Sequence, residues 1–274
     1  MKMHRLIAAA FMAAVALGAV SAASPATRNG GPPDSIGAIG DSITTGACTD
    51  RTCSDRPANS WSTGTNPAVD SHLLRLRAVL KSSASRASVR AFDYASSLHV
   101  TMADLATQAR EAVHDQVRYV TIEIGENDLC SGVSPASFRS NLERGLAVLS
   151  RSANHPKILL LSIENLAAHW RALRNDPTAA RALKAGAVLD CGLGYYTATD
   201  KTLSRVQSRA GLLNGVLAEV CSKHPLCLYD AGTYFRLPLR ASFFSPADYQ
   251  HLSLAGQRAL AAAEWKVARK FLYD

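Results

Sequence analysis

The sequence predicts a doubly wound α/β sandwich with a central parallel sheet of about five strands. Five short apolar runs bounded by turn residues alternate with stretches in which apolar residues recur at helical spacing. The apolar runs are nearly continuous and rich in Val, Ile and Leu, which is typical of strands buried on both faces of a parallel sheet. No internal repeat or long linker divides the chain, so a single domain over residues 35–274 is expected.

The expected strands, in chain order, are Ser35–Gly40, Ser88–Asp93, Val117–Gly125, Lys157–Ile163 and Leu226–Tyr229. Four apolar stripes at helical spacing predict helices that pack against the sheet, and they begin at Val69, Phe138, Val206 and Leu260. Ser134–Pro135 suits the start of the second helix. Residues 166–200 hold no clear strand, so we expect an insertion over one end of the sheet.

The first 23 residues have the pattern of a secretory signal peptide. Lys2 and Arg5 precede the apolar run Leu6–Val20, and small residues follow it, so we expect cleavage after Ala22 or Ala23. This run falls short of the roughly 20 residues that a membrane span needs. Residues 24–34 then form a short leader into the domain. The pattern predicts a secreted, extracellular protein without a stable membrane span.

The composition is that of a globular protein. Of the 274 residues, 47% are hydrophobic and 19% are charged, which excludes a collagenous or disordered chain. The formal charge of +8, from 30 Lys and Arg against 22 Asp and Glu, is spread along the whole length. Because only 7% of residues are aromatic and no nucleic-acid motif is present, we expect no nucleic-acid partner.

Six cysteines lie beyond the signal sequence. In an exported chain an even number favours disulfides over zinc, and the spacings do not match metal knuckles. Six cysteines allow 15 pairings. We favour the neighbour scheme, which has two tight loops and one long bridge: Cys48–Cys53, Cys130–Cys191 and Cys221–Cys227.

Two short motifs follow predicted strands. Gly40-Asp41-Ser42 comes after the first strand, where a strand-to-helix turn would lift a serine nucleophile above the sheet near a helix N-terminus. A plain helix cap by Asp41 or Ser42 is the alternative. Gly125-Glu126-Asn127-Asp128 follows the third strand, and the Asn127 amide could donate to an oxyanion. Here the alternative is a simple turn.

A third motif, Asp248-Tyr249-Gln250-His251, precedes the last helix. A spacing of three can place the Asp248 carboxylate beside the His251 ring, where it would fix the tautomer and stabilise the imidazolium. The other histidines are expected at the surface or in packing: His4, His72, His99, His114, His155, His169 and His224. Ligands of doubly wound sheets bind beyond the carboxyl ends of the strands. The three motifs in this order therefore predict one serine hydrolase site.

At these residues the sequence resembles the SGNH/GDSL hydrolase family. Gly40-Asp41-Ser42 matches its nucleophile block, Gly125-Glu126-Asn127-Asp128 its G-x-N-D block, and Asp248-x-x-His251 its terminal block. The resemblance implies a flavodoxin-like, three-layer α/β/α sandwich and neither a metal nor an organic cofactor. It also implies Ser42, Asp248 and His251 as catalytic residues, with Asn127 and the Ser42 backbone N–H in the oxyanion hole. The cysteines and the segment Asn59-Ser60-Trp61-Ser62 look most like secreted lipase, esterase and phospholipase members.

One block departs from the family pattern. Members usually carry a Gly after the second strand, whose backbone N–H joins the oxyanion hole. The corresponding stretch, residues 93–105, contains no Gly. A backbone donor needs no Gly, so we expect Ser96, Ser97 or Leu98 to supply the N–H, with Ser97 as the candidate.

The expected function is a secreted, monomeric serine ester hydrolase. It would cleave carboxylic esters of lipids or other acyl compounds through an acyl-enzyme. The alternatives are a carbohydrate O-acetyl esterase, acyl transfer to another acceptor, and a catalytically weak secreted binding module on the same fold. The partner implied is the ester substrate: a lipid, an acylated small molecule or a glycan.

Overall fold

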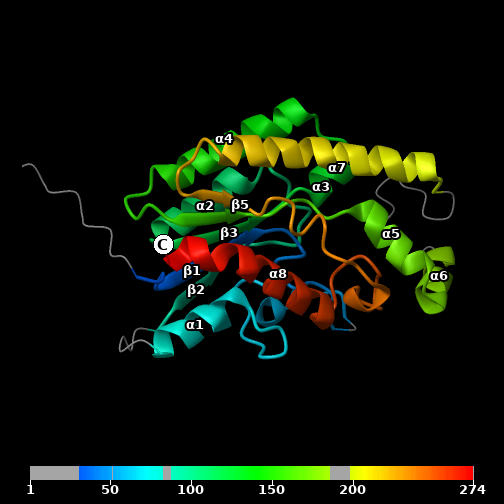
Figure 1. Cartoon of the computed structure of the whole chain (residues 1–274), viewed down its shortest axis with the longest axis horizontal. Helices are drawn as coiled ribbons and strands as arrows, with labels where there is room; N and C mark the ends of the chain where they lie inside the picture. Colours follow the sequence, from blue (N-terminus) through cyan, green and yellow to red (C-terminus); the bar gives the residue numbers. More distant parts are fainter. Residues whose placement is uncertain (1–30, 51, 83–87, 186–197, 274) are drawn as a thin grey trace, which may run out of the picture. The chain divides into compact units, whose positions relative to one another are not determined.

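A computed structural model describes residues 31–50, 52–82, 88–185 and 198–273, and these lie in one compact unit. Its centre is a five-stranded parallel sheet with the strand order β2-β1-β3-β4-β5 (Figure 1). This is the flavodoxin-like order, so the predicted fold class is confirmed. The strands are β1 (Ser35–Gly40), β2 (Arg90–Asp93), β3 (Tyr119–Glu123), β4 (Lys157–Leu160) and β5 (Cys227–Tyr229).

The five strands differ in burial according to their place in the sheet. Every residue of β1 and β3 is buried, as expected of central strands covered on both faces. The prediction that all five strands are buried in this way is wrong for the edges. Three of the four β2 residues are exposed, and all of β5 is only half-buried. An edge strand has one neighbour and less helical cover, and an apolar run in the sequence does not reveal its place in the sheet.

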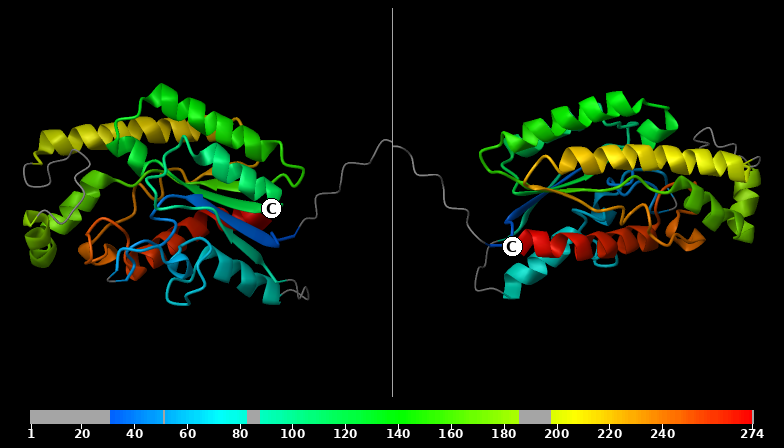
Figure 2. Two further views of the ribbon diagram at one scale, coloured as in Figure 1. Left: turned by 180° about the vertical axis from the view of Figure 1, so that it is seen from behind. Right: turned by 45° about the horizontal axis from the view of Figure 1, so that its top comes forward.

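Helices cover both faces of the sheet (Figures 1 and 2). One layer contains α2, α4 and α7, and the other contains α1 and α8, where the rings of His72 and Trp265 meet edge to face at 5.2 Å. The helices are α1 (His72–Ser82), α2 (Leu105–His114), α3 (Glu126–Cys130), α4 (Pro135–Ser150), α5 (Leu166–Arg174), α6 (Pro177–Lys184), α7 (Asp200–Cys221) and α8 (Leu254–Tyr273), with short 3-10 turns η1 (Pro57–Asn59) and η2 (Ala241–Phe243).

The four predicted apolar stripes coincide with helices α1, α4, α7 and α8, except that Val69, the first residue of the first stripe, lies in a turn before α1. Ser134 caps α4 as predicted, because its side chain accepts a hydrogen bond from the Ser137 N–H. The described part of residues 166–200 contains α5, α6 and the start of α7 and no strand. Helices α5 and α6 lie beyond the end of the sheet at which the parallel strands finish (Figure 1).

The structure contains the Cys48–Cys53 and Cys221–Cys227 disulfides. The third expected pair includes Cys191, which lies outside the described residues, as does the predicted signal peptide. Across the described ranges, no helix combines the length and apolarity needed to cross a membrane.

Candidate active site

The Ser42 turn begins directly after β1. A side chain at Gly40 would place its Cβ 2.3 Å from the Thr44 hydroxyl, so only glycine allows this turn to fold back so closely. The Asp41 carboxylate accepts a hydrogen bond from the Ile43 N–H at 3.0 Å and is buried beneath the turn. Ser42 is half-buried, and neither its hydroxyl nor its backbone N–H donates a hydrogen bond within the described part of the chain. Both groups are free to act on a ligand.

The expected helix after Ser42 is absent, which corrects the sequence prediction. Residues 41–50 form successive turns, with one hydrogen bond of the α-helical i to i−4 type, from the Thr45 N–H to the Asp41 carbonyl at 3.1 Å. Gly46 and Cys48 have φ values of 68° and 56°, and such left-handed residues stop a helix from continuing. Hence no helix macrodipole acts at Ser42, and its environment depends on side chains and single N–H groups.

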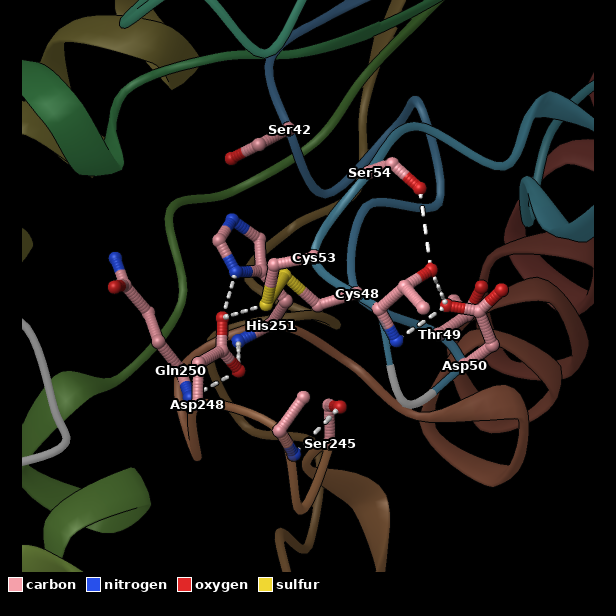
Figure 3. The surroundings of a disulfide bond; sticks show 12 residues. Ser42, Cys48, Thr49, Asp50, Cys53, Ser54, Ser245, Asp248, Gln250 and His251 are labelled. Carbon is pink, nitrogen blue, oxygen red and sulfur yellow. Dashed lines mark hydrogen bonds and ion pairs between the residues drawn. A yellow bond between two sulfur atoms is a disulfide. The ribbon is translucent and has the colours of Figure 1, made fainter.

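Asp248 and His251 form the hydrogen-bonded pair that their spacing predicted. His251 Nδ1 contacts Asp248 Oδ2, while Asp248 Oδ1 accepts the backbone N–H groups of Gln250 at 3.0 Å and His251 at 3.2 Å. Figure 3 shows the His251 ring with Asp248 on its Nδ1 side and the Ser42 hydroxyl on the side of the other nitrogen. The loop is closed by the Ser245 N–H, which donates to the His251 carbonyl at 2.7 Å.

The charges of this pair support each other. Burial opposes ionisation of Asp248, but its hydrogen bond with His251 and the imidazolium charge outweigh that cost and hold its pKa below the ordinary value. Burial likewise disfavours the His251 imidazolium. The hydrogen bond and charge of Asp248, with smaller contributions from Glu126 and Asp41, nevertheless raise the pKa of His251 above 6.5.

Asn127 lies on the short helix α3, directly after β3. Its Nδ2 donates to the Val100 carbonyl at 2.8 Å, which fixes the amide and leaves its second hydrogen available. Asp128 Oδ2 accepts the Met102 N–H at 2.8 Å, so this block anchors the loop after β2. Gly125 begins α3 with φ of 146°, a conformation that favours glycine.

The loop after β2 offers one free backbone donor among the three candidates. The Ser96 N–H donates to the Gly40 carbonyl at 3.3 Å, and the Leu98 N–H to the Ser96 hydroxyl at 3.3 Å. The Ser97 N–H has no acceptor among the described residues. His99 has φ of 52°, so this loop contains one residue in the left-handed region even though it lacks a glycine.

Buried carboxyl groups surround these residues. Burial raises the pKa of Asp41 to about 6, and it raises that of Glu123, beneath the Ser42 turn, well above its ordinary value. Burial, followed by the charges of Glu164 and Asp41, raises the pKa of Glu126 to about 8.

The motifs of the site match a family model for GDSL-like lipases and acylhydrolases over residues 38–259. The chain belongs to this family. The SGNH/GDSL resemblance is thereby confirmed, and this family member is a carboxylic ester hydrolase. No curated protein matches the sequence significantly.

Solved structures of esterases share the fold of this GDSL family member. A catalytic mutant of the acetylxylan esterase Axe2 from Geobacillus stearothermophilus has 17% identity and a TM-score of 0.52 over 86% of this chain and 94% of its own. The esterase EstA from Pseudoalteromonas sp., inhibited by monoethylphosphonate, has 12% identity and a TM-score of 0.51, and the match covers 88% of this chain and 100% of EstA. A lipase/acylhydrolase from Enterococcus faecalis has 21% identity and a TM-score of 0.51, and the match covers 86% of this chain and 95% of the other. At such identities the likeness concerns the fold.

Two residues near the site escaped the sequence analysis. Glu164 follows β4, at the same end of the sheet as the motifs, and His169 was expected at the surface or in packing. Both side chains are about 1% exposed and form an ion pair. An acidic residue after a predicted strand and a His five positions later were the available signals.

The Cys48–Cys53 disulfide lies against the loop that carries Asp248 and His251 (Figure 3). Cys53 Sγ is 3.7 Å from Asp248 Oδ2. These three residues form the one group of potential metal ligands found in the described part of the chain. Since the two sulfurs are joined to each other, they offer no thiolate, and the group fits a disulfide packed on a carboxylate better than a metal centre.

Proposed function

We propose that this family member is an exported serine ester hydrolase that works through an acyl-enzyme on Ser42. The Ser42 hydroxyl oxygen attacks the ester carbonyl while His251 Nε2 takes its proton. The tetrahedral intermediate expels the alcohol, which receives that proton from His251. Water then attacks the acyl-enzyme by the same route, releasing the acid and free Ser42. Asp248 keeps His251 in the tautomer with the proton on Nδ1 and stabilises the imidazolium formed at each step.

One observation carries this proposal: the Asp248–His251 hydrogen bond lies beside a serine whose hydroxyl is unengaged (Figure 3). A serine used only as a cap would donate or accept a bond within its turn. Here the Asp41 side chain already accepts a hydrogen bond from the Ile43 N–H, so the turn does not need the Ser42 side chain as a cap. The missing Ser42–His251 hydrogen bond is ordinary for a site without substrate, where such bonds are often long.

Three donors support an oxyanion hole. The Ser42 and Ser97 backbone N–H groups have no acceptor in the described ranges, and Asn127 Nδ2 keeps one free hydrogen. Donors fixed in advance stabilise the negative oxygen of the tetrahedral intermediate without reorganisation. Ser97 thus serves where other members use a glycine.

The substrate we propose is a lipid or another acyl ester. Leu98, next to Ser97, is 86% exposed and lies on the loop that holds Asn127, where it could contact an apolar acyl chain. Export rests on the N-terminal sequence pattern and on the two disulfides, which persist in oxidising compartments. The catalytic unit is the single domain over residues 35–274, acting as a monomer.

The test is a chain-length series of p-nitrophenyl esters combined with a covalent probe. The oxidised protein should hydrolyse the butyrate and palmitate esters, and a fluorophosphonate should inactivate it with a mass increase on the Ser42 peptide. A sharp preference for the acetate ester would instead support a carbohydrate O-acetyl esterase. Hydrolysis that survives complete labelling of Ser42 would refute the acyl-enzyme proposal.

Loss of the Cys48–Cys53 disulfide should lower turnover, because the segment 48–55 contacts the Asp248 loop, the turn after Ser42 and the Ser97 loop. Cys53 contacts Asp248, and Asp55 accepts hydrogen bonds from Thr45 at 2.8 Å and Ser97 at 3.1 Å. In the double variant C48S/C53S, we expect kcat to fall about tenfold to a hundredfold, as for a displacement of about 1 Å at a catalytic group.

The other disulfide provides a matched control. Cys221–Cys227 joins the end of α7 to β5, and its loop separation of 6 nearly equals the 5 of Cys48–Cys53. Chain entropy then predicts a similar loss of about 2 kcal/mol in the free energy of unfolding for each pair. Thermal melts and initial rates check both variants. Equal effects of the two pairs on kcat would contradict a positioning role for Cys48–Cys53.

A further inference from the structure

His169 and Glu164 form a buried pair outside the proposed triad. His169 Nδ1 lies 2.8 Å from Glu164 Oε1, an ion-pair contact without hydrogen-bond alignment. The second Glu164 oxygen accepts a hydrogen bond from the Tyr234 hydroxyl at 2.7 Å. The His169 ring stacks on Phe244, with 3.6 Å between ring centroids and 6° between planes. Both partners are therefore held from several elements.

The other nitrogen of His169 reaches the loop that carries the triad residues. Nε2 bonds to the Tyr249 carbonyl at 2.9 Å, which requires a proton on Nε2 because a carbonyl can only accept. That carbonyl belongs to the same peptide unit as the Gln250 N–H, which donates to Asp248 Oδ1 at 3.0 Å. Because a peptide unit is planar, fixing its C=O also fixes the direction of its N–H.

The backbone of Tyr249 has an intrinsically unfavourable conformation. Tyr249 has φ of 52°, a left-handed value that a residue with a side chain rarely adopts. Such a conformation persists where surrounding contacts hold it. The bond from His169 and the one from the Tyr249 N–H to the Ser245 carbonyl, at 2.7 Å, are the contacts that do so.

We propose that Glu164 and His169 are positioning residues for Asp248, holding the Tyr249–Gln250 peptide so that its N–H points at the Asp248 carboxylate. The inference rests on the proposed role of Asp248. Neither residue touches the reacting atoms. The connection runs from Glu164 to His169, through one peptide unit to Asp248, and on to His251.

The charge state of His169 suits this role. Burial disfavours its imidazolium, but the charges of Glu164 and Glu126 outweigh burial and raise the pKa of His169. An imidazolium carries protons on both nitrogens, so it can face Glu164 and donate to Tyr249 at once.

His251 is faced by Asp248 on its own loop, by Glu126 on α3 and by Asp41 after β1. A looser Asp248 would thus remove the largest support for the His251 imidazolium.

The test compares H169N with the double variant E164Q/H169N. The double variant leaves no unpaired buried charge, so it serves if the single variant folds poorly. We expect kcat to fall about tenfold to a hundredfold, KM to change less than about twofold, and the acid limb of kcat/KM to move to lower pH. H72N is the matched control. His72 is also fully buried with both nitrogens engaged, by the Tyr119 hydroxyl at 2.8 Å and the Ala261 carbonyl at 3.2 Å. Its loss should lower the melting temperature and leave kcat and the pH profile unchanged.

A measurement on the unaltered protein makes the proposal independent of variant folding. In 15N spectra of the His169 imidazole at neutral pH, Nε2 should be protonated, because it faces a carbonyl that can only accept. An unprotonated Nε2 would overturn the proposal. So would a folded His169 variant with wild-type kcat and pH profile. Assaying S42A alongside separates the two levels. Activity retained in S42A would refute the proposed function, whereas an inactive S42A with fully active His169 variants would refute only the positioning role.

Discussion

Ser42→Ala should lower kcat by about 10⁴–10⁶-fold, the range seen when a catalytic serine is removed. The physical reason is that the acyl-enzyme cannot form, and His251 has no hydroxyl proton to take. The folded state should be unaffected. Because the Ser42 hydroxyl makes no hydrogen bond within the described residues, its removal should change the free energy of unfolding by less than about 0.5 kcal/mol. Steady-state rates on p-nitrophenyl butyrate and a thermal melt measure the two quantities.

Ser222→Ala is the matched control for this change. Ser222 is an exposed residue at the end of α7 whose hydroxyl donates to the Glu219 carbonyl. This variant should keep wild-type kcat. Substantial esterase activity in a folded Ser42→Ala protein would exclude Ser42 as the nucleophile. Loss of both activity and folding would instead give Ser42 a structural role that its contacts do not indicate.

Asp248→Asn should lower kcat by about 10³–10⁴-fold, because an amide neither fixes the Nδ1-protonated tautomer of His251 nor stabilises its imidazolium. The variant should also shift the pH profile. His251 acts as a base only when neutral, and its pKa is raised above 6.5, chiefly by the hydrogen bond and charge of Asp248. In the wild type kcat/KM should therefore fall as the pH drops through a value above 6.5. In the variant the residual activity should fall at lower pH, since the largest support for the imidazolium is gone.

The control for the second prediction is Asp200→Asn, which removes an exposed carboxylate in the first turn of α7. It should leave kcat and the acid limb unchanged. Profiles of kcat/KM from about pH 5 to pH 9 are the measurement, a window chosen to span ordinary histidine pKa values. An acid limb in the same place for wild type and Asp248→Asn would show that Asp248 does not set the protonation of His251.

Much of this architecture could be read from local sequence patterns. Short Val, Ile and Leu runs between helical stripes fix a parallel sheet, since only strands covered on both faces are apolar throughout. Asp248 and His251 could be paired in advance because a spacing of three keeps both side chains within one turn of chain. Ser134 could be assigned as a cap for the same reason, since its partner Ser137 is three residues away.

Other features depend on contacts between distant segments. The sequence predicted a helix after Ser42, but Gly46 and Cys48 adopt left-handed φ values and no helix forms there. The left-handed φ of Cys48 cannot be predicted from its residue type. The free N–H of Ser97 emerges only because the neighbouring Ser96 donates to Gly40, at the end of another strand. His99, without glycine, still takes the left-handed conformation of that loop.

By itself the sequence determined the α/β class, which is encoded by periodicity, and the residues of the three motifs, which are encoded by spacings of a few residues. The resemblance of those motifs to a known family then indicated the family. Only the tertiary structure decided which strands lie at the edges, and that Glu164 and His169 reach the Asp248 loop. His169 and Tyr249 are 80 residues apart in the chain. Their contact depends on how α5 and the loop before α8 pack at the end of the sheet, and no local pattern in a single sequence records the direction of a side chain across that distance.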